Sequence, residues 1–117
     1  MAVYFQTNDP EGLLQKFKSA IAQTSQEGKI TTWTASRDGK YYTHASKQWE
    51  YAAWMKPVVE ARRLTFYIIK SKKTFVSQSA YGFYHGHMIE TFLNHFDRLF
   101  DGGSATAMPV PGDLVSS

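Results

Sequence analysis

The chain has 117 residues, a formal net charge of +3, 43% hydrophobic and 15% aromatic residues, and no cysteine. This composition argues against a disordered chain or a two-domain enzyme and is typical of one globular domain with a single core. Disulfides, thiolate metal sites and cysteine nucleophiles are excluded because each needs a thiol. No apolar run reaches the length of a signal sequence or a membrane span, so we expect a cytoplasmic protein without a membrane partner.

The first predicted helix covers residues 10–26, after a short strand at the start of the chain. Asn8 and Asp9 are good N-cap residues, and a proline is tolerated in the first helical turn. Apolar residues then recur at helical spacing, and Gly28 is a natural residue to follow the C-terminus.

Residues 30–45 predict a β-hairpin. They are rich in Thr, Trp and Tyr and contain Asp38-Gly39, a pair typical of a two-residue type I′ turn. Such a turn fixes the register of the two strands. The pairs expected on the core side are Trp33 with His44 and Ala35 with Tyr42.

Two further strands follow the hairpin. Apolar residues alternate with polar ones over residues 48–59, which indicates a half-buried strand, although Pro57 would place it at an edge or shorten it. A short helix over 47–55, capped by Ser46, is the alternative. Residues 64–69 are apolar at nearly every position, as in a central strand covered on both faces.

The period changes to that of a helix over residues 80–100, where the apolar side chains share one half of the helical wheel. Gly82 and Gly86 inside this helix indicate a close approach to another helix, a partner chain or a ligand. We predict an α+β domain over 1–103 and a disordered tail over 104–117. Its antiparallel sheet has four to five strands in the order β-α-β-β-β-β-α, with two amphipathic helices packed on it.

The histidines are the remaining near-neutral titratable groups. The helical wheel puts His85 in the apolar face and His87 on the opposite, solvent side, so we expect no metal site and no cofactor. Burial of His44 and His85 should lower their pKa values and keep them neutral at pH 7. No catalytic motif is present, which favours a protein that is not an enzyme.

The positive charge is concentrated in residues 56–73, which hold six basic residues against the single acid Glu60. An anionic partner would meet the basic residues on either side of the 64–69 strand. These residues are Arg62, Arg63, Lys70, Lys72 and Lys73.

We therefore expect a non-catalytic binding domain with a protein partner or a second copy of itself. Its interaction surface would be a ridge on the solvent side of the second helix, together with an aromatic residue of the sheet. These residues are Phe83, His87, Glu90, Asn94 and Trp54. A nucleic-acid-binding domain using residues 56–73 is the first alternative, and a small-ligand or metal-dependent enzyme centred on His85 is the second.

Overall fold

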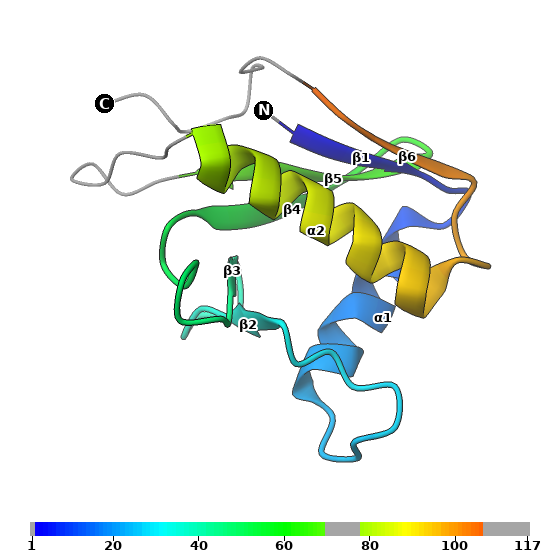
Figure 1. Ribbon diagram of the computed structural model, residues 1–117. Helices are drawn as coiled ribbons and strands as arrows, with labels where there is room; N and C mark the ends of the chain where they lie inside the picture. The colour runs from blue at the N-terminus through cyan, green and yellow to red at the C-terminus, as the bar shows by residue number, and fades with distance from the viewer. Residues whose placement is uncertain (1, 70–77, 107–117) are drawn as a thin grey trace.

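The computed structural model describes residues 2–69 and 78–106 of the chain, and these form an α+β fold as predicted. Its elements are, in chain order, β1 (Ala2–Gln6), α1 (Pro10–Ala22), β2 (Trp33–Ala35), β3 (Tyr42–His44), β4 (Trp54–Glu60), β5 (Arg63–Ile69), α2 (Gln78–Phe96) and β6 (Gly102–Ala105). The described strands form one antiparallel sheet of six strands in the order β2-β3-β4-β5-β1-β6 (Figure 1), slightly more than the predicted four to five.

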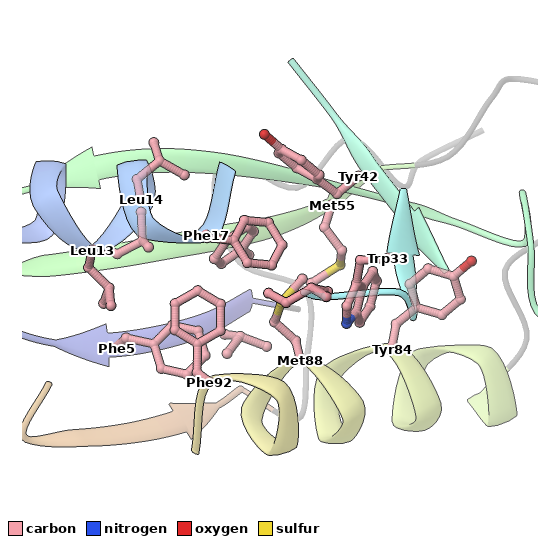
Figure 2. Packing of buried hydrophobic residues seen from close by; sticks show 14 of the residues in the cluster. Phe5, Leu13, Leu14, Phe17, Trp33, Tyr42, Met55, Tyr84, Met88 and Phe92 are labelled. Atoms are coloured by element: carbon pink, nitrogen blue, oxygen red, sulfur yellow. The ribbon is translucent and has the colours of Figure 1, made fainter. Parts of the chain in front are cut away.

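Both helices pack on the same face of the sheet. The ring centres of Phe17 of α1 and Phe92 of α2 lie 5.2 Å apart (Figure 2). Each of these rings also contacts the ring of Phe66 of β5. Phe5 of β1 stacks on Phe92 at 4.1 Å, so that two helices and two strands share one aromatic cluster. This cluster is the centre of the core, because all four rings are completely buried.

The first helix begins where the sequence predicts. The Asp9 carboxylate accepts a hydrogen bond of 2.9 Å from the Gly12 amide, and Pro10 occupies the first turn. The helix ends at Ala22 rather than near residue 26, because Gln23 adopts an extended backbone conformation (ψ 150°).

The β2–β3 hairpin confirms the predicted register but not the predicted turn. Trp33 lies opposite His44, as expected. A type I′ turn needs two residues with a positive φ, but among the turn residues only Gly39 has one. The Ser36 amide donates to the Tyr41 carbonyl oxygen over 2.8 Å and closes a four-residue loop over 37–40. The register is as predicted because the predicted two-residue loop and the observed four-residue loop are centred on the same peptide bond, between Asp38 and Gly39.

Residues 46–52 form hydrogen-bonded turns, and β4 starts only at Trp54. The Ser46 carbonyl oxygen accepts from two amides of this segment, as the helical alternative expected, but no regular helix follows. Pro57 is tolerated because β4 pairs with β3 only at Met55, which leaves the rest of this strand edge without a β3 partner.

Every fourth residue of the second helix is buried from residue 84 onwards, and these residues are Tyr84, Met88, Phe92 and Phe96. Leu93, expected on the apolar side, is 53% exposed, whereas the polar Thr91 is buried, so the buried face is rotated relative to the one that the wheel indicated. Gly82 and Gly86 do not mark a close approach within the described part of the chain, because a Cβ at either position would have no neighbour within 4 Å. No helix in residues 2–69 and 78–106 is long and apolar enough to cross a bilayer.

A sixth strand follows α2 where the sequence has no periodic pattern. Residues 102–105 pair with β1, so the prediction of a disordered tail from residue 104 is wrong for residues 104 and 105. A Cβ on Gly103 would come within 3.2 Å of the Phe5 ring, which explains how a glycine-rich segment fits against a large side chain here. Residues 107–117 of the predicted tail lie outside the described residues.

Candidate functional site

The predicted ridge on α2 is partly covered. Phe83 is half-buried, because the Trp49 indole stacks on it at 4.6 Å with an interplanar angle of 11° and the His44 ring meets it edge-on at 4.7 Å. The expectation that Phe83 lies on the solvent side of the helix is therefore wrong, since the turns over 46–52 and β3 cover that side. The ridge residues that stay exposed are Glu90 and Asn94.

The four histidines form one pair and two single residues. His44 Nε2 lies 2.6 Å from His87 Nδ1. The expectation that His87 points to solvent, apart from the other histidines, is wrong because the hairpin brings His44 to that side of α2. His85 is only 4% exposed, with its Nδ1 2.6 Å from the Tyr81 carbonyl oxygen, and this burial does not favour a role as an accessible general acid or base. His95 is exposed.

The backbone at Ser46 fixes the positions of the protons in the His44–His87 pair. The Ser46 amide donates to His44 Nδ1 over 3.1 Å, and the Ser46 hydroxyl lies 2.9 Å from the same nitrogen, so in the neutral ring Nδ1 carries the lone pair and the ring hydrogen is on Nε2. The Nε2–H group therefore donates to His87 Nδ1. Burial, assisted by the neighbouring His87, lowers the pKa of His44 to about 4, which keeps its ring neutral at pH 7.

This geometry does not favour metal binding. A histidine that binds a metal through Nε2 usually donates its Nδ1–H to a second partner, whereas His44 Nδ1 is an acceptor. The separation of 2.6 Å is that of a hydrogen bond and is shorter than two imidazoles keep around a tetrahedral ion about 2 Å from each nitrogen. Within the described ranges, no three His, Asp or Glu side chains are grouped as metal ligands.

Further hydrogen bonds attach the hairpin to α2 beside the histidines. The Trp33 indole N–H donates to the Thr91 hydroxyl over 2.9 Å, and that hydroxyl donates to the His87 carbonyl oxygen over 2.8 Å. The His44 amide donates to the Tyr84 hydroxyl over 3.3 Å. Both strands of the hairpin are thus bonded to the same helix.

The predicted basic segment contributes fewer free charges than its composition implies. Arg63 forms an ion pair of 2.9 Å with Glu60, and its guanidinium lies 4.3 Å from the centre of the Tyr4 ring. Burial opposes ionisation of Glu60, but hydrogen bonds from Thr65 and Arg63 outweigh it and lower the pKa of the carboxyl. Arg62 is exposed in the β4–β5 turn. The other predicted contacts, Lys70, Lys72 and Lys73, lie outside the described residues.

Trp54, the predicted sheet member of the interaction surface, is half-buried beside Tyr51. Their ring centres are 5.9 Å apart, and Tyr51 is 63% exposed. The two residues form a small aromatic patch at the start of β4.

A lysine-lined pocket opens where the hairpin separates from β4. β3 pairs with β4 only through Tyr42 and Met55, so the hairpin tip diverges from the β4 edge. The resulting pocket has a volume of about 420 Å³ between the hairpin tip, β4 and α1. Its lining residues are Leu14, Lys18, Gly39, Lys40, Tyr41, Lys56 and Pro57.

Three lysines line this pocket, and no acidic residue is among its lining residues. No ion pair joins Lys18, Lys40 or Lys56 to an acid in the described part of the chain. The adjacent carboxylate of Asp38 is engaged in the turn, where it accepts from the Ser36 hydroxyl at 2.6 Å and the Lys40 amide at 3.0 Å. These hydrogen bonds, that of Ser36 most of all, lower the pKa of Asp38.

Sequence reasoning missed this pocket. Lys56 was counted in the basic segment, but Lys18 is a polar residue of a helix and Lys40 follows a turn, and neither position carries a local signal. Only the way in which the hairpin and α1 flank β4 brings the three side chains to one place.

Known proteins provide no independent guide to either site. The residues of this chain must therefore carry any inference about its function. Comparison with protein-family models, curated protein sequences and solved structures finds no match to the chain.

Proposed function

We propose that this protein is a non-catalytic binding domain that holds a small polyanionic ligand, of the class of phosphate esters, in the lysine pocket. The observation that carries the proposal is the convergence of Lys18, Lys40 and Lys56, from three different elements, on one concave site of about 420 Å³. That volume lies in the range of ordinary small-molecule sites.

The electrostatics of the pocket support an anionic occupant. Like charges that share a site repel one another, and here no acidic lining residue offsets them. Lysine ammonium groups are compact point charges that suit phosphate oxygens. A ligand with two or more negative charges would relieve the repulsion and gain a contact with each side of the pocket.

The other expected functions have less support. A protein or self-association surface along α2 would use Phe83 and His87, which are half-buried. A nucleic-acid surface over residues 56–73 would use Arg63, whose charge is paired with Glu60. A concave site lined by three lysines that form no ion pair within residues 2–69 and 78–106 is better suited to a compact anion than to an extended strand.

Titration calorimetry with inorganic tripolyphosphate at pH 7.5 tests the proposal. We expect Lys18→Gln, Lys40→Gln and Lys56→Gln each to weaken binding about threefold to tenfold, because each removes one charge contact. Lys16→Gln is the matched control: it makes the same change at an exposed position of the same helix, outside this pocket. Its affinity should equal that of the unaltered protein.

Two results would contradict the proposal. Equal weakening by all four substitutions would mean that the affinity for tripolyphosphate depends only on the net charge of the protein. Tight binding of a single-stranded oligonucleotide that Arg62→Gln abolishes and Lys18→Gln leaves unchanged would instead favour the nucleic-acid alternative.

A further inference from the structure

We propose that the ligand of the lysine pocket is a nucleotide, and that Tyr41 selects it by stacking on its base while the lysines hold its phosphates. This inference rests on the proposed function of the pocket and narrows the ligand from small polyanions in general to phosphate esters of a planar aromatic group. Tyr41 is thus the specificity-determining residue of the site.

Each element around the pocket contributes an uncharged side chain near its lysine. The pairs are Leu14 with Lys18 on α1, Tyr41 with Lys40 in the hairpin, and Pro57 with Lys56 on β4. An inorganic polyanion would contact the lysines and leave the three uncharged side chains facing water. A ligand that joins an anionic group to an apolar one would use both kinds of residue.

Tyr41 is the lining residue that points to an aromatic ligand. It is half-buried, yet within residues 2–69 and 78–106 its ring has no aromatic or cationic partner and its hydroxyl group has no hydrogen bond. Only its backbone is engaged, through hydrogen bonds with Ser36. The six other tyrosines of the chain all have a side-chain partner: Arg63 for Tyr4, Phe17 for Tyr42, Trp54 for Tyr51, Glu60 for Tyr67, His85 for Tyr81 and Trp33 for Tyr84. The Tyr41 ring is therefore available to a ligand.

The chemistry of the pocket favours a planar aromatic group over an alkyl chain. A tyrosine ring offers a flat π-face, and stacking of a base on such a face stabilises a complex whatever the identity of the base. Gly39 leaves the hairpin tip open next to Tyr41, because it has no side chain and even a Cβ at this position would meet no other atom within 4 Å. A base can therefore approach the hairpin while the phosphates of the same molecule contact the lysines.

A single nucleotide fits these residues better than a nucleic-acid strand does. Proteins that bind single strands stack successive bases on several aromatic side chains along a basic groove. Among the described residues that line this pocket, Tyr41 is the one aromatic residue. The exposed Tyr51 is not a lining residue, and its ring is paired with Trp54. The pocket thus offers one stacking position beside one group of lysines.

Titration calorimetry at pH 7.5 without divalent cations compares adenosine triphosphate (ATP) with inorganic tripolyphosphate. Tripolyphosphate carries at least as much negative charge, so charge alone predicts that it binds at least as tightly as ATP. We expect ATP to bind about tenfold more tightly, because it adds one stacked base. Equal affinities, or tighter binding of tripolyphosphate, would overturn the nucleotide inference and leave the proposed function standing.

Tyr41→Leu removes the aromatic face but keeps an apolar side chain. It should lower the affinity for ATP to that for tripolyphosphate and leave the latter unchanged, whereas Tyr41→Phe should retain the preference for ATP. Tyr51→Leu is the matched control at an exposed position outside the pocket and should change neither affinity. A preference for ATP that persists in Tyr41→Leu overturns the inference. Absence of binding by both ligands, or binding that Lys18→Gln does not weaken, overturns the proposed function instead.

A second measurement needs no variant and therefore covers a Tyr41→Leu protein that does not fold. In NMR spectra of the unaltered protein, ATP should shift the Tyr41 ring signals and give nuclear Overhauser effects between this ring and the adenine protons, whereas tripolyphosphate should not shift them. Tyr41 ring signals that stay fixed when ATP binds would overturn the inference. A single-stranded oligonucleotide that binds more tightly than ATP and also shifts the Tyr51 ring signals would contradict the choice of a single nucleotide.

Discussion

Replacing His44 with glutamine should flatten the acid dependence of stability. In the folded protein, burial and the neighbouring His87 lower the pKa of His44 from 6.5 to about 4. Above pH 6.5 the folded and unfolded states both hold a neutral ring. Between pH 6.5 and pH 4 only the unfolded state binds the proton, so the free energy of unfolding falls as the pH is lowered.

The size of the effect follows from the two pKa values. The full decrease in the pKa, from 6.5 to about 4, corresponds to about 3 kcal/mol once both states are protonated. Between pH 7.5 and pH 5 the expected loss is about 2 kcal/mol, because the folded ring is still mostly neutral at the lower pH. This loss is a large fraction of the stability of a small domain.

Urea denaturation followed by tryptophan fluorescence at several values between pH 7.5 and pH 5 measures this loss. The His44→Gln variant should lack it, whereas His95→Gln should retain it because His95 is exposed. Comparing proteins at each pH removes the contribution of carboxyl groups, which all three share. Parallel pH profiles for the unaltered protein and His44→Gln would refute the assignment of His44 as a buried, neutral ring.

Four further substitutions test the packing and the backbone conformation. Phe17→Ala empties a fully buried position and should lower the free energy of unfolding by about 3–5 kcal/mol in urea titrations; a loss below about 1 kcal/mol would contradict its central place. Gly82→Ala should stabilise the protein by about 0.5–1 kcal/mol, because alanine favours a helix over glycine and its Cβ meets no neighbour. Gly39→Ala should destabilise the protein by about 1 kcal/mol, because the φ of Gly39 is +74°. Thermal melts in which both substitutions move the melting temperature in the same direction would contradict this pair of predictions. Trp33→Phe should cost about 1–2 kcal/mol by removing the donor to Thr91, and a double-mutant cycle with Thr91→Val that gives no coupling would dismiss that hydrogen bond.

The hairpin shows how far local sequence signals reach. Strand propensity and the position of Asp38-Gly39 were sufficient for the pairing of Trp33 with His44, because register depends only on the centre of the turn. They were insufficient for the turn type, since the Asp38 carboxylate accepts hydrogen bonds from the Ser36 hydroxyl and the Lys40 amide, and these stabilise a longer loop.

Strand β6 shows a different limit. Residues 102–105 have neither alternation nor strand propensity, and they become a strand because β1 presents an open edge with Phe5 opposite Gly103. Such pairing is set by the neighbour, so inspection of the segment alone predicts an irregular chain.

The sequence by itself determined a single α+β domain with two amphipathic helices, a hairpin of defined register and a central apolar strand, because each depends on a repeat within one segment. Only the tertiary structure decided that His87 meets His44 and that Lys18, Lys40 and Lys56 share one pocket. A helical wheel gives the direction of a side chain relative to its own axis. What that side chain meets depends on how the hairpin is placed against α2, α1 and β4, and this placement is a property of the whole core.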